Sequence, residues 1–146
     1  MTITKDNYCI STEKEKLDID FIHSFLTGSY WAEGISKEVI KKSIDDALCF
    51  GVYDGEKQVG FARMITDKAT FAYLADVFII EQYRGRGLSK WLMEVIMSHP
   101  DLLGLRRIML ATRDAHGLYK QFGFVPLTNV DRWMQIHNPD IYKKAI

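Results

Sequence analysis

The sequence predicts one mixed α/β (α+β) domain over residues 1–146, and three observations carry that prediction. Two stretches with apolar residues at helical spacing precede two strand-like runs joined by the turn Asp54-Gly55. A long apolar strand then leads through a glycine-rich basic turn into an amphipathic helix. Another strand and another short helix follow. Strands first in a meander and then alternating with helices indicate a mixed sheet with flanking helices.

The N-terminal third is predicted to contain a short strand and two helices. The strand covers residues 7–11, and the first helix covers residues 17–26, where its apolar stripe ends before Gly28. Ser36 is the type of residue that caps a helix start, because its hydroxyl can accept a backbone N–H of the first turn. The second helix is therefore expected to run from Ser36 towards Leu48.

The rest of the chain alternates between extended and helical patterns. The predicted strands are 48–53, 58–66, 70–80, 106–111 and a last one from Val125, and the predicted helices are 88–97 and 115–122. Beyond residue 129, apolar side chains at Trp133, Ile136, Ile141 and Tyr142 indicate a tail that packs on the body or on a partner.

The turn at residues 82–87 has the features of an anion site. Gly85 and Gly87 allow backbone N–H groups to approach a ligand, because no Cβ stands in the way. The following helix start adds unpaired N–H groups and a partial positive charge, and Arg84 and Arg86 add two full charges. The pattern favours a phosphate or pyrophosphate. The alternative is a simple tight turn with solvated arginines, and the turn matches neither the P-loop nor the dinucleotide-binding pattern.

Composition restricts the function classes. Lysine plus arginine and aspartate plus glutamate are 19 each, so the net charge is zero, which argues against nucleic-acid or membrane-surface binding. Cys9 and Cys49 lie in apolar contexts and are expected to be buried thiols in a reducing compartment. No metal site is expected from the spacing of potential ligands. The N-terminus has no signal-peptide core, so we expect a cytoplasmic protein.

Two motifs together resemble those of a known family. The first is Gln82-x-x-Gly85-x-Gly87. The second is Thr112-x-x-Ala115-x-x-Leu118-Tyr119 followed by Gly123-Phe124. In this order and at this separation they are similar to the two signatures of the GNAT superfamily of acetyl-coenzyme A-dependent N-acetyltransferases. The resemblance covers roughly residues 48–127.

The resemblance implies a fold, an activity and a coenzyme site. The fold is a mostly antiparallel central sheet whose fourth and fifth strands splay apart, with flanking helices. The cosubstrate is acetyl-coenzyme A, and the acetyl group passes directly to an amine in a ternary complex. The implied coenzyme-binding residues are Val77, Phe78, Ile79, Gln82, Arg84, Gly85, Arg86, Gly87, Leu88, Ser89 and Lys90.

The resemblance also implies catalytic residues. Tyr119 occupies the position of a phenol that donates a proton to the leaving thiolate; the alternative is a tyrosine that only packs in the core. Asp76 is the candidate base, and its alternative is a structural carboxylate that meets an arginine or backbone N–H groups. Other family members use a glutamate on the following strand as the base, and its counterpart in this chain falls near Arg107. Asparagine is frequent where this chain has Thr112, and Asp114 is expected to cap the last helix.

The acceptor substrate and the partners are less directly implied by the resemblance than the coenzyme site is. Candidates to line an acceptor pocket are Tyr30, Trp31, Glu33, Arg63, Asp67 and Tyr73, which would suit a small amine or a peptide amine. Each could instead be a core-covering or solvated side chain. Two other functions stay open: transfer from a different acyl-coenzyme A, and a coenzyme-binding sensor without catalysis. Family members are often homodimers, and the sequence itself leaves the oligomeric state open.

Overall fold

The protein is described by a computed structural model over residues 1–143, which form an open six-stranded sheet. The strands lie in chain order, and every neighbouring pair is antiparallel except the last, which is parallel. Their bounds are β1 Thr2–Lys5, β2 Tyr8–Ser11, β3 Leu48–Asp54, β4 Lys57–Thr66, β5 Phe71–Ile79 and β6 Arg107–Leu110. The predicted mixed, mostly antiparallel sheet is therefore confirmed.

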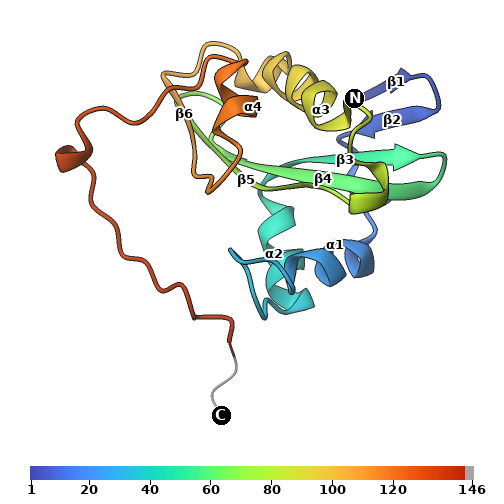
Figure 1. Ribbon diagram of the computed structural model, residues 1–146, viewed down its shortest axis with the longest axis horizontal. Helices are drawn as coiled ribbons and strands as arrows, with labels where there is room; N and C mark the ends of the chain where they lie inside the picture. Colours follow the sequence, from blue (N-terminus) through green and yellow to red (C-terminus); the bar gives the residue numbers. More distant parts are fainter. Residues whose placement is uncertain (144–146) are drawn as a thin grey trace.

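Helices cover both faces of this sheet (Figure 1). The helices α1 (Ile19–Leu26) and α2 (Lys37–Asp45) pack on one face, and α3 (Leu88–Met97) and α4 (His116–Lys120) on the other. Four short 3-10 helices connect them, at Lys14–Lys16, Glu81–Tyr83, Pro100–Leu102 and Val130–Arg132. None of the helices in residues 1–143 is long and apolar enough to cross a bilayer.

Two apolar clusters form the core, one on each face of the sheet. Neighbouring strand residues divide between them because side chains alternate along a strand. Phe61 belongs to the cluster under α1 and α2, whereas Ala62 belongs to the cluster under α3. Leu92 and Ile96 of α3 are fully buried, as the helical spacing of their apolar stripe requires.

Local signals predicted several elements well. The helix 88–97 has the predicted bounds, and the Ser36 hydroxyl accepts the Val39 N–H at 3.2 Å as a helix cap. The helix α1 begins later than predicted, after Asp18, whose carboxylate accepts the Phe21 N–H. The strand β1 was not predicted; it pairs with β2 through a turn in which Asp6 has a φ of 54°.

Three expectations were wrong. No strand forms after Val125 within the described residues, because that segment pairs with no neighbour. Asp114 does not cap α4: Ala115 holds the cap position, and its N–H donates to the Thr112 hydroxyl. Cys9 is half-buried rather than buried, although Cys49 is buried and its burial raises the pKa of the thiol to about 11.

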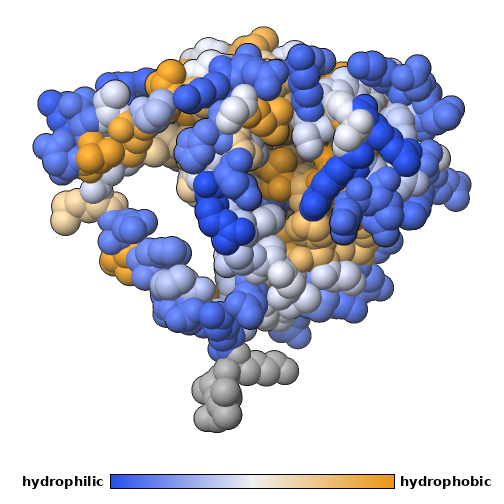
Figure 2. Space-filling view, viewed as in Figure 1, coloured by the Kyte–Doolittle hydropathy of each residue, from blue (hydrophilic) through white to orange (hydrophobic). Residues whose placement is uncertain are grey.

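The chain beyond α4 leaves the body. It runs outward as an arm and returns at Tyr142 to the cluster under α1 and α2. Figure 2 shows open space between this arm and the body. We call residues 129–143 the arm throughout.

Candidate functional site

The strands β5 and β6 separate halfway along β5. Their pairing runs from Phe71 opposite Arg107 to Leu74 opposite Leu110 and then stops. Residues 75–79 of β5 therefore have no strand partner on the β6 side. The Ile79 carbonyl accepts the Arg84 Nε–H, whereas the other backbone groups of this edge that point away from β4 have no strand partner among the described residues and can pair with an extended ligand. This is the splay that the family resemblance implied between the fourth and fifth strands of the family fold.

A bulge in β5 lies at the start of the splay. The β4–β5 register shifts between Phe61 and Arg63, and Asp76 has a left-handed φ of 57°, which is uncommon outside glycine. One carboxylate oxygen of Asp76 accepts the Trp31 Nε1–H at 2.9 Å, and the other accepts the Arg63 Nε–H at 2.9 Å. The contact with an arginine is the structural role that the sequence left open as the alternative to a base.

The glycine turn forms a small cavity next to the splay. Its volume is about 230 Å³, and it is lined by Ile79, Tyr83, Arg84, Gly85, Gly87, Leu88, Ser89, Lys90 and Leu118. Gly85 and Gly87 have φ values of 79° and 78°, and a Cβ on either would point into open space. A phosphate could occupy that space, in contact with the backbone.

The N–H groups of this turn are available to a ligand. The first N–H of α3 to bond a carbonyl is that of Trp91, to Gly87 at 3.0 Å. The N–H groups of residues 85–90 donate to no backbone carbonyl within the described residues. These N–H groups and the positive end of the helix dipole are the features from which the sequence predicted an anion site.

The two arginines of the turn take different positions. Arg84 Nε donates to the Ile79 carbonyl at 2.9 Å, which holds its guanidinium at the cavity wall. Arg86 instead donates to the Tyr8 hydroxyl at 2.9 Å and to the Gln82 carbonyl at 3.2 Å, and its guanidinium carbon lies 4.7 Å from the centre of the Tyr83 ring. Arg86 and Gln82 therefore do not line the cavity.

The predicted residues of β5 divide between the two faces. Val77 packs against the cluster under α3, and Phe78 lies in the cluster under α1 and α2, where it stacks on Phe25 at 3.9 Å between ring centres. Their side chains serve the core, so only their backbone groups can face the splay. Of the three predicted residues Val77, Phe78 and Ile79, only Ile79 lines the glycine cavity.

Tyr119 is placed beside the splay by α4. It is buried, and its ring meets Phe124 edge-to-face at 5.9 Å. Burial raises the pKa of the phenol, and the nearby Tyr30 and Asp114 raise it further, so the phenol is neutral at neutral pH. Leu118, the preceding residue, lines the glycine cavity. One short helix thus joins the anion site to the candidate proton donor.

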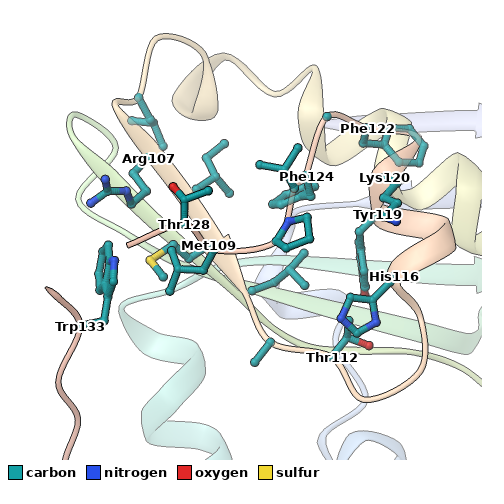
Figure 3. Close-up of a pocket in the computed structure, with 18 of the residues that line it drawn as sticks. Arg107, Met109, Thr112, His116, Tyr119, Lys120, Phe122, Phe124, Thr128 and Trp133 are labelled. Carbon is teal, nitrogen blue, oxygen red and sulfur yellow. The ribbon is translucent and has the colours of Figure 1, made fainter. Parts of the chain in front are cut away.

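A larger cavity of about 990 Å³ lies on the other side of Tyr119. It is walled by β6 and by residues 122–129, which follow α4. Figure 3 shows Thr112, His116 and Tyr119 together at one end and Trp133 beside Arg107 at the other. The Arg107 guanidinium carbon lies 4.7 Å from the Trp133 ring centre, so Arg107 holds the arm and offers no carboxylate for proton transfer.

The predicted acceptor residues are only partly brought together. Tyr30 and Trp31 are exposed in the α1–α2 loop, and their rings meet edge-to-face at 5.1 Å. Arg113, which the sequence did not indicate, lies over the Tyr30 ring at 3.9 Å. Its partner is far away in the chain, so no local pattern could have identified it. The Trp31 indole of this group donates to Asp76 of the β5 bulge, and Asp76 also accepts the Arg63 Nε–H. These hydrogen bonds connect the α1–α2 loop to the bulge.

Three of the other acceptor candidates have structural contacts. The Asp67 carboxylate accepts the Thr70 hydroxyl and then the N–H groups of residues 69–71 in the β4–β5 turn, and these hydrogen bonds, the hydroxyl's first, lower the pKa of the carboxyl. Asp67 does not line either cavity. Glu33 forms an ion pair with Lys143 of the arm at 3.5 Å. Tyr73 is half-buried in β5, opposite Met109 of β6.

Comparisons with known proteins agree with this geometry. Residues 14–124 match the model of the acetyltransferase (GNAT) family. A protein of Gibberella zeae, named as a provisional acetyltransferase, is 30% identical over 139 residues, which cover 80% of this chain and 77% of the relative.

Two solved structures illustrate the range of likeness. A GNAT-family protein from Xanthomonas campestris pv. campestris is 47% identical, with a TM-score of 0.92 over 94% of this chain and 97% of that one. An acetyltransferase from Clostridium acetobutylicum, solved with acetyl-coenzyme A, shares the fold at 14% identity, with a TM-score of 0.64 over 90% of this chain and 95% of that one.

The family match includes the β5–β6 splay, the glycine turn and Tyr119, and it ends at Phe124, before the arm. The chain belongs to the GNAT family of acetyltransferases and is an enzyme of the N-acetyltransferase type.

Proposed function

We propose that the protein moves an acetyl group from acetyl-coenzyme A to a primary amine of a small molecule or peptide, by direct transfer in a ternary complex. The observation that carries this proposal is the unpaired edge at residues 75–79 of β5, which lies between the glycine cavity and Tyr119. An extended ligand with a pyrophosphate at one end and a reactive group at the other fits that arrangement.

The residues of the glycine turn would hold the pyrophosphate. Backbone N–H groups of residues 85–90, in the glycine turn and at the start of α3, donate to no described backbone carbonyl, and Arg84 and Lys90 line the same cavity with positive charge. The free edge of β5 would pair with the pantetheine arm through main-chain hydrogen bonds. Bound acetyl-coenzyme A supplies the activated acyl group.

Tyr119 would act as the general acid. A thiolate leaving group needs a proton, and a neutral phenol with a raised pKa keeps that proton until the transfer. The aromatic contact with Phe124 holds the ring in place on the side of α4 that faces the larger cavity. A phenylalanine at this position would keep the packing and lose the proton.

Asp76 has contacts that favour a positioning role over that of a base. Both of its oxygens accept hydrogen bonds, from Trp31 and from Arg63, so the carboxylate joins the α1–α2 loop to the bulge of β5. We propose that it holds the bulge open and orients the acceptor loop, and that the amine proton leaves to water.

Calorimetric titration with acetyl-coenzyme A tests the proposal, with coenzyme A and ATP as controls. We expect saturable one-to-one binding of both coenzymes and none of ATP. A panel of primary amines then follows, with acetylated product detected by mass. Failure to bind either coenzyme would overturn the proposal. Binding of coenzyme A without turnover of any acetyl donor would instead favour the sensor function.

A further inference from the structure

Arg113 brings to the acceptor side a positive charge that no described residue neutralises. Its guanidinium carbon lies 3.9 Å from the centre of the Tyr30 ring, so one face of that ring is covered by a cation and closed to an ammonium group. The Arg113 side chain is exposed, and it forms no ion pair or hydrogen bond within residues 1–143, not even with Asp114 next to it. Its planar fork of N–H donors is therefore free to bind a ligand.

A second arginine nearby has unused donors. Arg63 gives its Nε–H to Asp76, while no described residue accepts from its two terminal nitrogens. Solvent reaches these nitrogens, because neither is among the buried side-chain atoms that lack a partner. Trp31 donates its indole N–H to Asp76 and meets the Tyr30 ring edge-to-face, so one continuous group of side chains joins the two arginines.

The acidic side chains that could hold a cationic acceptor are already engaged. Both oxygens of Asp76 accept hydrogen bonds. Glu33 is paired with a lysine of the arm, and Asp67 is bonded to its own turn. With Arg63 and Arg113 against Asp76, the connected group carries one net positive charge. This charge favours an acceptor with an anionic group and disfavours a polyamine.

The connected group lies beside the reacting centre. Burial raises the pKa of the Tyr119 phenol most, and the Tyr30 phenol is close enough to raise it further. Asp76 lies in the β5 bulge, where the pairing with β6 has just ended. Arg113 belongs to residues 111–115, which lead from β6 into the helix that carries Tyr119. An acceptor whose amine reaches the splay can therefore place a second group against Arg113.

We propose, as an inference that depends on the proposed acetyl transfer, that the acceptor is an amine that also carries a carboxylate, as a free amino acid does, and that Arg113 binds this carboxylate. A guanidinium offers parallel N–H groups to the two oxygens of a carboxylate, and the Tyr30 ring supports it in that position. The terminal nitrogens of Arg63 are available to the same anion. One carboxylate balances the one net positive charge of the connected group.

The transfer then yields an N-acetyl amino acid and coenzyme A. The amine nitrogen forms a bond to the acetyl carbon, and the thioester C–S bond breaks. Tyr119 gives its proton to the leaving thiolate, and the amine loses a proton to water. Arg113 takes no part in these steps: it binds the acceptor and determines which amines are accepted.

The test compares amino acids with their neutral amides. Each standard amino acid and its amide is offered with acetyl-coenzyme A, and release of the free thiol gives kcat/KM. We expect at least one amino acid to react about tenfold faster than its amide or more, because the amide keeps the amine and the shape but has no negative charge. For that amino acid, Arg113→Gln should lower kcat/KM about tenfold or more, mainly through KM, and should change the value for the amide by no more than about twofold.

Two further variants make the comparison specific. Arg113→Lys should keep part of the preference for the acid, because the charge remains and the paired N–H groups are lost. Lys42→Gln is the matched control: it removes the same charge from an exposed position of α2 that lines neither cavity, and it should keep the wild-type ratio of acid to amide.

The absence of a preference for any amino acid over its amide, including the absence of turnover with every amino acid, would overturn the inference. An equal loss for acid and amide in Arg113→Gln would do the same, because a merely structural arginine would affect both substrates alike. Acetylation of other amines would leave the proposed acetyltransferase standing in either case. A failure to bind coenzyme in the calorimetric titration removes the proposed function itself, so the two failures have different readouts.

Discussion

Asp76 and Arg63 form an ion pair across the bulge of β5, with the Arg63 Nε 2.9 Å from the Asp76 carboxylate. The two side chains are only 9% and 16% exposed, so the pair is largely shielded from solvent. Asp76 also holds Trp31, and through it the α1–α2 loop. The pair therefore connects the strand edge that would receive the coenzyme with the loop that borders the acceptor side.

Asp76→Asn should weaken the fold more than the chemistry. Removing one member of a shielded pair leaves the Arg63 charge uncompensated, and we expect a loss of about 3 kcal/mol in the free energy of unfolding. Denaturant titration measures this. The double variant Arg63→Met/Asp76→Asn should recover part of it, because no charge is then left unpaired. A normal stability combined with a shifted pH–rate profile would show instead that Asp76 is the base.

Tyr119→Phe should reduce turnover by about a hundredfold or more, the usual contribution of a general acid. The affinity for the coenzyme should change by no more than about twofold, which corresponds to about 0.4 kcal/mol of binding free energy. Losing a hydrogen bond to the bound coenzyme would cost more than that. Steady-state rates and calorimetry separate the two effects. Tyr53→Phe, which also removes a tyrosine hydroxyl from the sheet but lies away from both cavities, is the control and should keep its rate. Unchanged turnover in Tyr119→Phe would exclude the phenol as the acid.

Ser89→Asp should block coenzyme binding without harming α3. An acidic residue in the first turn of a helix is favourable for the helix dipole, by about 0.3–1 kcal/mol. At the same point it repels a pyrophosphate, so we expect at least a tenfold weaker affinity, about 1.4 kcal/mol. Val39→Asp places the same charge in the first turn of α2, away from the glycine cavity, and should bind coenzyme normally. Equal affinities in both variants would contradict the anion site.

Tyr53→Phe should leave the protein equally or more stable. The Tyr53 hydroxyl is buried and has no hydrogen-bond partner among the described residues, so removing it can recover up to about 1–3 kcal/mol. Burial also raises the pKa of this phenol above its usual range. Tyrosines of the unfolded chain ionise near pH 10 while Tyr53 stays protonated in the folded one, so stability falls as the pH rises above about 10. The variant should lose less stability there in parallel unfolding titrations at pH 8 and pH 10.5; an equal loss would argue against the buried, unpaired hydroxyl.

Features with a strong local signal were predicted correctly from the sequence. The helix at 88–97 and the Ser36 cap depend on residues within one or two turns of each other, and the glycine turn depends on its own backbone. The splay followed from the family resemblance, and the β5–β6 register bears it out.

Features that depend on distant contacts were missed. Trp31 meets Asp76 across 45 residues of chain, and Arg113 meets Tyr30 from a different loop. Asp67 was predicted to line the acceptor pocket because its charge is evident from the sequence. Its hydrogen bonds to the N–H groups of the turn depend on the backbone conformation, which the sequence does not show. A strand after Val125 would need a neighbour, and none of the residues 1–143 is placed beside it as one.

The chain order of the strands has a consequence for the rate and route of folding. β3, β4 and β5 form two consecutive hairpins, so their pairings close only short loops. Two other pairings close long ones: β2 with β3 across residues 12–47, and β5 with β6 across the crossover that contains α3. Long closures cost chain entropy before their contacts repay it. We expect the central three strands to be formed in the transition state and β6 to dock late, so that substitutions in β6 speed unfolding while those in β4 slow folding.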